Sequence, residues 1–226
     1  MSRLVRAGGW LFRRRTSLPV PLALALLLIP SSDASRASTL FAVGAVIVGA
    51  GELLRLWAVR HIGVISRTRS DRLGPLVSTG PFSFVRNPLY LGNIALWVGF
   101  AVSAGLVWLV PIFVVVLSLE YHAIVRWEED LLASRRREEY RAYAARVPRW
   151  IPSIVAGRQS TIDSRPSTAT AIHSPAANRQ SVDELPLLTD GCRLPTNSWP
   201  ETFFSERGTL IAIAVGYLLL WMKHIV

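Results

Sequence analysis

The sequence has little of what common metal-dependent and nucleotide-binding enzymes use to build their sites. Its one cysteine, Cys192, excludes an internal disulfide and argues against a cysteine-rich metal site. Its four histidines do not cluster at metal-ligand spacing, so no metal is predicted. The glycine-rich GxGxxG pattern, the Walker motif and the HExxH zinc motif are missing as well. Any chemistry has to come from other arrangements of residues.

Long apolar runs dominate what is present. Hydrophobic residues make up 51% of the 226 residues, in stretches that a soluble core would interrupt with polar positions. We predict an all-α, polytopic helical membrane protein with about five transmembrane helices. The expected spans are residues 17–33, 39–59, 88–102, 106–125 and 208–222. A signal peptide is the alternative for the first, cleaved in the Ser/Ala-rich stretch after Pro30.

The formal net charge of +10 comes almost wholly from arginine. Nucleic-acid binding is one explanation of so basic a chain, but arginines also mark the cytoplasmic loops of membrane proteins. With five spans and a cytoplasmic N-terminus, 22 of the 25 basic residues fall in cytoplasmic segments. This distribution follows the positive-inside rule. We therefore predict a multi-pass protein of the bacterial inner membrane with no nucleic-acid partner.

Composition divides the chain into three parts. Residues 1–152 are predicted to form the membrane domain, with a motif-bearing core at 52–152. Residues 153–205 are rich in Ser, Thr, Pro, Asn and Gln, and we expect a disordered cytoplasmic linker there. Residues 206–226 hold the C-terminal transmembrane helix. The sequence does not specify an oligomeric state.

A helical hairpin with polar clusters at its ends is the central expected feature. The nearly uncharged stretch 89–119 is too long for one span, since about 20 apolar residues suffice. Ser103-Ala104-Gly105 is its natural break. A hairpin returns its two ends to one membrane face. Arg86 should therefore meet Glu128 and Glu129 on the cytoplasmic side, where soluble cofactors are available.

Polar residues near this hairpin extend the predicted site. Pro88 starts a helix whose free N–H groups can bind an anion. His122 and Glu129 share a helix face, although His122 could instead be a packing residue. Glu52 and Arg55 lie on one face of the preceding span, either as an interface ion pair or as part of a pocket. Together these groups suit a zwitterionic ligand.

The order of these motifs resembles one membrane family. The resemblance to the isoprenylcysteine carboxyl methyltransferases rests on Thr79-Gly80-Pro81-Phe82, Arg86 to Gly92, Glu128-Glu129, Tyr140, Tyr143 and Val147 to Pro152. Phospholipid N-methyltransferases share the central part. The resemblance covers residues 52–152. It implies an integral membrane enzyme that takes S-adenosylmethionine from the cytoplasm and a lipophilic small-molecule or lipidated acceptor from among the membrane lipids.

Carried over by position, the resemblance implies roles for individual residues. The cofactor walls would be Arg86, Asn87, Pro88, Tyr90 and Gly92 on one side and Glu128 and Glu129 on the other. The expected catalytic residues are Arg86, Tyr90 and His122, and the expected substrate contacts are Glu52 and Arg55.

Two positions depart from the family's pattern. Asn87 stands where the family usually has a histidine, and it cannot titrate. A carboxylate acceptor, already ionised at pH 7, therefore fits better than an amine or thiol, although phospholipid N-methylation and thiol S-methylation stay open. Arg136-Arg137 replaces the usual Phe-Gly, which bears on substrate identity more than on cofactor binding.

Two other classes of protein remain as alternatives. A reductase of the sterol-reductase type would bind NADPH and would need basic residues placed for a 2′-phosphate, a pattern that the sequence does not display. A membrane scaffold without enzymatic activity would use the polar clusters only to anchor its helices.

Overall fold

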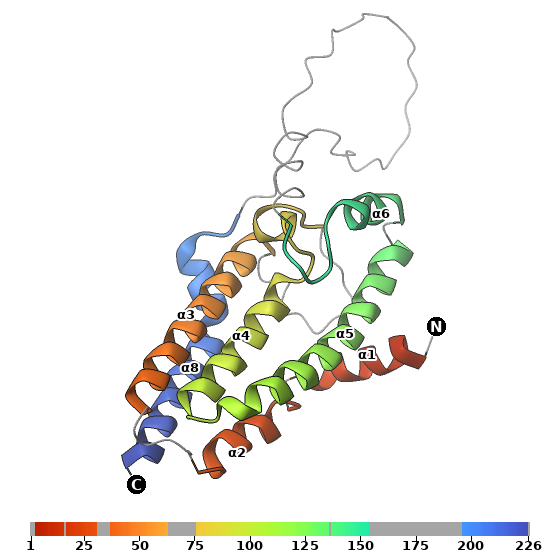
Figure 1. The fold of residues 1–226 in the computed structure, drawn as a ribbon. Helices are drawn as coiled ribbons and strands as arrows, with labels where there is room; N and C mark the ends of the chain where they lie inside the picture. The colour runs from red at the N-terminus through yellow and green to blue at the C-terminus, as the bar shows by residue number, and fades with distance from the viewer. Residues whose placement is uncertain are drawn as a thin grey trace, which may run out of the picture.

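The fold is built from helices alone in the part of the chain that the structure, a computed structural model, describes. The described ranges are residues 3–15, 17–30, 37–62, 76–135, 137–153 and 196–225. The helices are α1 (Arg3–Arg14), α2 (Val20–Leu28), α3 (Ala37–Ile62), α4 (Pro88–Ser103), α5 (Val110–Arg135), α6 (Arg137–Arg146) and α8 (Trp199–Ile225), with short 3₁₀ turns η3 (Gly80–Ser83) and η4 (Val107–Leu109) (Figure 1). Within these ranges the predicted all-α class is confirmed.

The helices α4 and α5 form the predicted hairpin. The chain reverses at Gly105, whose φ of 72° lies in the left-handed region that glycine adopts without a steric penalty. The side chains of Leu106, Phe113 and Leu117 are almost completely buried just after the turn. The turn sits at one end of the bundle, and from it α4 and α5 both extend toward the other end, moving apart as they go (Figure 1).

Glycines bring α3 and α4 into close contact. A Cβ atom added to Gly92 would lie 2.9 Å from the carbonyl oxygen of Gly51, and one added to Gly99 would lie 2.7 Å from that of Gly44. Real side chains do not fit at such distances, so the two backbones approach as closely as small residues allow in membrane helix pairs. The pair fixes the position of α3 beside the hairpin.

Three described stretches are long and apolar enough to cross a membrane: Ser38–Ile62, Val107–Arg135 and Trp199–Lys223. They support an integral membrane protein. The helix α4 has 16 residues and α2 has 9, fewer than the roughly 20 that a span requires. Since the residue before a proline is disfavoured in a helix, Pro30 limits α2 at its C-terminal end. The count of five spans therefore stays a prediction.

Beyond the predicted end of the returning span at Val125 the chain stays helical, because α5 continues without a break to Arg135. One predicted boundary is wrong. The last helix begins at Trp199, inside the segment assigned to the linker; Ser198 and Glu201 form a reciprocal capping box there, with backbone N–H to side-chain oxygen distances of 3.0 and 3.4 Å. Residues 154–195 of the predicted linker lie outside the described residues.

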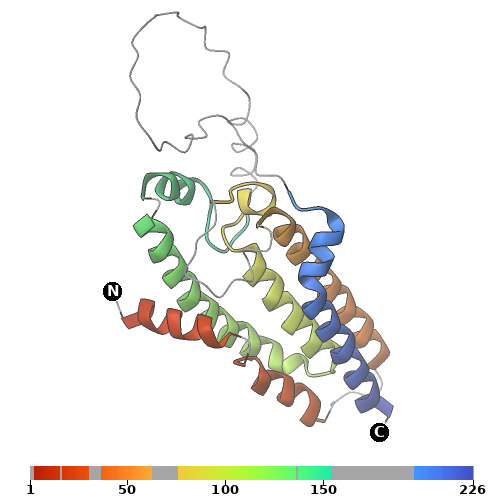
Figure 2. The same cartoon turned by 180° about the vertical axis from the view of Figure 1, so that it is seen from behind.

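The N-terminal and C-terminal helices pack around the hairpin and α3. The helix α1 lies along α5, where Gly8 and Gly9 contact Ala123 and Trp127. The helix α8 runs beside α3 in both views (Figures 1 and 2). These helices complete the wall of the cavity that the hairpin opens onto.

Candidate functional site

A cavity of about 1010 Å³ lies between the helices, with residues of α1 to α6 and α8 in its wall. Its polar limb, at the open end of the hairpin, contains Arg86, Asn87, Tyr90, Glu128 and Glu129. Its apolar limb lies deeper in the bundle and contains Leu26, Leu96, Phe100, Ala212, Gly216 and Leu220. Because ligand pockets usually measure about 300–1,000 Å³, this cavity has room for two reactants side by side.

An ion-pair cluster closes the hairpin at the polar limb. Nη1 of Arg86 lies 2.9 Å from Oε1 of Glu129. The guanidinium of Arg149 binds the same carboxylate in a bidentate manner: Nε donates to Oε1 at 2.9 Å, and Nη2 donates to Oε2 at 2.6 Å. The predicted convergence of the two hairpin ends is therefore present in the fold. Two arginines share one carboxylate, so these three side chains carry a net positive charge.

The segment that follows α6 holds this cluster in place. The backbone N–H of Arg86 donates to the carbonyl oxygen of Pro148 at 2.9 Å, and Nδ2 of Asn87 donates to that of Arg149 at 3.1 Å. The hydroxyl of Tyr143, on α6, donates to the carbonyl oxygen of Phe82 at 2.8 Å. These bonds tie residues 147–153 to the turn that precedes α4, and so position Arg149 opposite Glu129.

The N-terminus of α4 is available to a ligand. Asn87 is the N-cap residue, but its side chain does not cap the first turn. With Pro88 at the first helical position, the backbone N–H groups that follow remain candidates for an anion. Nε of Arg86 is buried and has no hydrogen-bond partner among the described residues. An anionic group in the polar limb would therefore find hydrogen-bond donors at the first turn of α4 and at Nε of Arg86.

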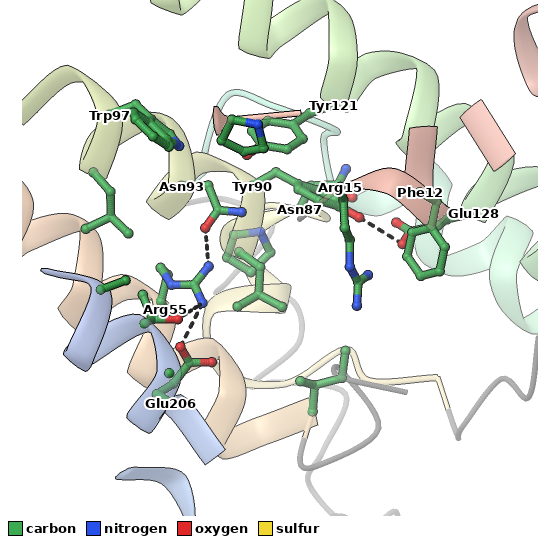
Figure 3. A pocket seen from close by; sticks show the side chains of 18 of the residues that line it. Phe12, Arg15, Arg55, Asn87, Tyr90, Asn93, Trp97, Tyr121, Glu128 and Glu206 are labelled. Carbon is green, nitrogen blue, oxygen red and sulfur yellow. Dashed lines mark hydrogen bonds and ion pairs between the residues drawn. The ribbon is translucent and has the colours of Figure 1, made fainter. Parts of the chain in front are cut away.

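A second carboxylate faces the cavity from the other side of the polar limb. The hydroxyl of Tyr90 donates to Oε1 of Glu128 at 2.9 Å, as Figure 3 shows. The ring of Tyr90 stacks on that of Tyr121, with centroids 4.8 Å apart. Arg15, the residue that follows α1, also lines the cavity. The stacked rings hold Glu128 where it can accept from a cationic ligand group.

The protonation of the groups on and after α6 suits this arrangement. Burial, followed by the negative charge of Glu129, raises the pKa of Tyr140 to about 12, and its hydroxyl accepts from Nη1 of Arg86 at 3.2 Å. The hydrogen bonds from Arg149 to Glu129 raise the pKa of the Arg149 guanidinium. At neutral pH the tyrosine is therefore neutral and the arginine charged.

A buried polar cluster lies across the cavity from Tyr90 and Glu128 (Figure 3). At its centre Arg55 donates through Nη1 to Oδ1 of Asn93 and through Nη2 to Oε2 of Glu206 at 2.7 Å. Nη2 also lies 3.1 Å from Oγ1 of Thr209, and Nε lies 3.3 Å from Oε2 of Glu52. Arg55 thus binds residues of α3, α4 and α8 at once.

The predicted site residues do not all reach the cavity. Arg86, Asn87, Pro88, Tyr90, Glu128, Glu129 and Arg55 line it. Gly92 instead packs against Gly51 and the stem of Arg55, so the close approach it permits is between helices. His122 is not among the lining residues, and Glu52 lies behind Arg55 as its ion-pair partner.

Several residues of the site were not predicted. Arg149 and Tyr140 lie in motifs that carry the family resemblance, and those motifs could have marked both. Asn93 follows Tyr90 by one turn of α4, so its spacing could have placed it on the cavity side. Glu206 had no local signal, because it lies far along the chain in another helix.

Residues 39–136 match the sequence model of a family described as phospholipid methyltransferase. This segment is therefore similar to a family of membrane methyltransferases. The match covers α3, α4 and α5, which carry the ends of the hairpin and most of the polar limb. It confirms the resemblance to this family for the matched segment and specifies no acceptor.

Two curated relatives are similar to the same part of the chain. The nickel-cobalt-cadmium resistance protein NccN of Alcaligenes xylosoxydans xylosoxydans is 33% identical over 122 residues, 54% of each chain. The cobalt-zinc-cadmium resistance protein CzcN of Cupriavidus metallidurans is 29% identical over 115 residues, 51% of this chain and 50% of its own. The chain spans about half the length of these relatives. No solved structure matches it significantly.

Proposed function

We propose that the protein is a multi-pass membrane methyltransferase that moves a methyl group from S-adenosylmethionine to a lipophilic acceptor. The observation that carries this proposal is the meeting of Arg86 with Glu129, and of Tyr90 with Glu128, on the wall of one cavity. The match of residues 39–136 to the methyltransferase family supports it. The proposal includes five spans and a cytoplasmic N-terminus, which put the polar limb on the cytoplasmic side, in accord with the positive-inside rule.

The residues of the polar limb fit both ends of an amino-acid group. Its carboxylate suits the first turn of α4 and the buried Nε of Arg86, which has no hydrogen-bond partner among the described residues. Its ammonium suits Glu128, which accepts one hydrogen bond from Tyr90 and has further acceptor capacity. Opposite charges therefore have separate places within the limb.

When bound, S-adenosylmethionine supplies a methyl group on a positively charged sulfur, and the carbon–sulfur bond breaks as the acceptor's lone pair bonds to that carbon. The protein has to align donor and acceptor and keep water away. Arg86, Tyr90 and Glu128 would align the donor with the acceptor, and the apolar limb would keep water away. We propose a carboxylate acceptor, because no base role follows for His122, which lies outside the cavity wall.

Ligand binding by the purified protein in lipid nanodiscs tests the proposal. We expect saturable binding of S-adenosylmethionine, competition by S-adenosylhomocysteine, and no competition by NADPH. Incubation with membranes and a methyl-labelled donor should then label a lipid or a lipidated product. Binding of NADPH in place of the donor would favour a reductase, and binding of neither ligand would favour a membrane scaffold.

A further inference from the structure

The apolar limb of the cavity is walled by helices that lie outside the family-matched segment. That segment ends at residue 136, whereas Ala212, Gly216 and Leu220 of α8 line the limb, together with Leu26 of α2. The side of α4 that faces them contributes Leu96 and Phe100. The polar limb thus comes mainly from the matched segment, and much of the apolar limb comes from helices outside it.

The helix α8 is attached at one end through the Arg55 cluster. Glu206 is 1% exposed, and its carboxylate accepts from Nη2 of Arg55 at 2.7 Å. Thr209, one turn later, accepts from the same nitrogen. Moving α8 away would separate the buried carboxylate of Glu206 from the guanidinium of Arg55, which is costly in a low-dielectric interior. The start of α8 is therefore fixed against α3 and α4.

The other end of α8 is attached to α2 and to the hairpin turn. Nζ of Lys223 donates to the carbonyl oxygens of Leu26 and Ile29 at 2.7 and 2.6 Å, where the last carbonyls of α2 have no partners within the helix. The hydroxyls of Tyr217 and Ser103 lie 3.2 Å apart. Polar contacts at both ends thus set the distance between α8 and α4.

Along its middle, from Thr209 to Leu220, one face of α8 lines the cavity over about 16 Å at 1.5 Å per residue. Within this stretch Gly216 and Tyr217 also pack against Phe100 of α4. Ala212 and Val215 line the cavity and are also solvent-exposed in the isolated protein, so the limb reaches the surface beside α8. In a membrane, that surface faces lipid.

We propose that the middle of α8 is the acceptor-binding wall of this enzyme: the apolar limb holds the hydrocarbon chain of a lipid acceptor, and the Arg55 cluster holds α8 at the distance that admits it. This inference rests on the proposed function. It predicts that α8 determines which chain lengths are accepted, because the buried side chains of Leu220 and Leu26 line the cavity at the end of α8 away from the Arg55 cluster. The polar limb binds the donor independently of α8.

Photocrosslinking of the full chain in nanodiscs tests this. The probe is a long-chain fatty acid that carries a diazirine near its methyl end, and mass spectrometry locates the adducts. We expect adducts on cavity-facing residues such as Phe100 and Gly216. Ala212→Trp should reduce these adducts about tenfold, the effect of excluding roughly two methylene groups from an apolar site. Ile211→Trp is the matched control, because Ile211 is 60% exposed and does not line the cavity.

The results separate this inference from the proposed function. Cavity adducts that Ala212→Trp does not diminish, or adducts spread evenly over the exposed face of α8, would overturn it. Ala212→Leu, a smaller change, decides the matter if the tryptophan variant fails to fold. Binding of S-adenosylmethionine is measured on the same samples. Its absence in the unmodified protein would count against the proposed function, whatever the crosslinks show.

Discussion

Arg86 and Glu129 stand at the two ends of one helical hairpin, and their side chains meet at 2.9 Å. Arg149 donates two hydrogen bonds to the same carboxylate. Glu129 is therefore occupied by protein groups, whereas Arg86 keeps a buried Nε without a partner among the described residues. Arg86 and Glu129 together are therefore better suited to bind the anionic end of a ligand than its cationic end. Glu128 remains to bind the cationic end.

Replacing Arg86 by alanine should weaken the binding of S-adenosylmethionine by about 30-fold or more. Arg86 carries the donor that the ligand's carboxylate would use. Truncating one partner of such a buried, hydrogen-bonded charge pair costs about 2 kcal/mol or more of binding free energy. Calorimetric titration of the nanodisc-embedded protein measures the effect. Arg141→Ala, at an exposed position on α6, is the control. Unchanged affinity in the Arg86 variant would show that the site is wrongly assigned.

The carboxylate of Glu128 can be tested separately from its hydrogen bond. Tyr90→Phe removes one hydrogen bond, worth about 1 kcal/mol, so donor affinity should fall roughly fivefold. Glu128→Gln keeps the size of the side chain but removes its charge, and we expect a larger loss if this group binds the donor's ammonium. Tyr217→Phe, remote from the polar limb, should leave affinity unchanged. Equal losses in all three variants would point to a general effect on folding instead.

The stability of the protein should fall as the pH rises from about 10 to 12. The pKa of Tyr140 is raised from 10.0 to about 12 in the fold, chiefly by burial. A raised pKa means that the folded protein holds this proton more tightly than the unfolded chain, so the stabilisation is complete below pH 10 and is lost as the pH passes the folded-state pKa. Thermal unfolding in alkaline buffers measures this. Tyr140→Phe should give a shallower pH dependence, and an identical slope would contradict the assignment.

The sequence was sufficient to predict the hairpin and the meeting of its ends. An apolar stretch too long for one span, a proline at its start and a glycine at its break leave little choice of fold. The charged residues after Val125 indicate the end of a membrane span. They are also good helix formers without a glycine or proline among them, so the chain stays helical and α5 continues to Arg135.

The partner of Arg55 could not be predicted from the sequence. Arg55 and Glu52 share a helix face, which suggests a local ion pair, and that pair is present at 3.3 Å. The shorter contact, to Glu206, depends on how α8 docks against α3, and no local pattern encodes docking between helices so far apart in the chain. The division of the cavity into a polar and an apolar limb escaped prediction for the same reason.

Removing the side chain of Arg55 should lower the free energy of unfolding more than removing that of Glu206. Arg55→Leu leaves two buried carboxylates, those of Glu52 and Glu206, without their shared cation, and should cost about 3 kcal/mol or more of folding free energy. Glu206→Leu leaves Arg55 still paired with Glu52 and bonded to Asn93, so its cost should be smaller. Chemical unfolding of both variants measures the difference.

The functional effect of Glu206→Leu should fall on the acceptor and not on the donor. If Glu206 fixes α8 at its distance from α4, losing that contact lets the apolar limb change width, while Arg86 and Glu128 keep their own partners on the far side of the cavity. We expect the apparent KM for a membrane lipid extract to rise and the affinity for S-adenosylmethionine to stay within about threefold, a difference smaller than one hydrogen bond contributes. Arg207→Leu, at an exposed position on α8, should change neither quantity. A variant with weakened donor binding and an unaltered KM for lipid would place the Arg55 cluster in the donor site and remove α8 from acceptor binding.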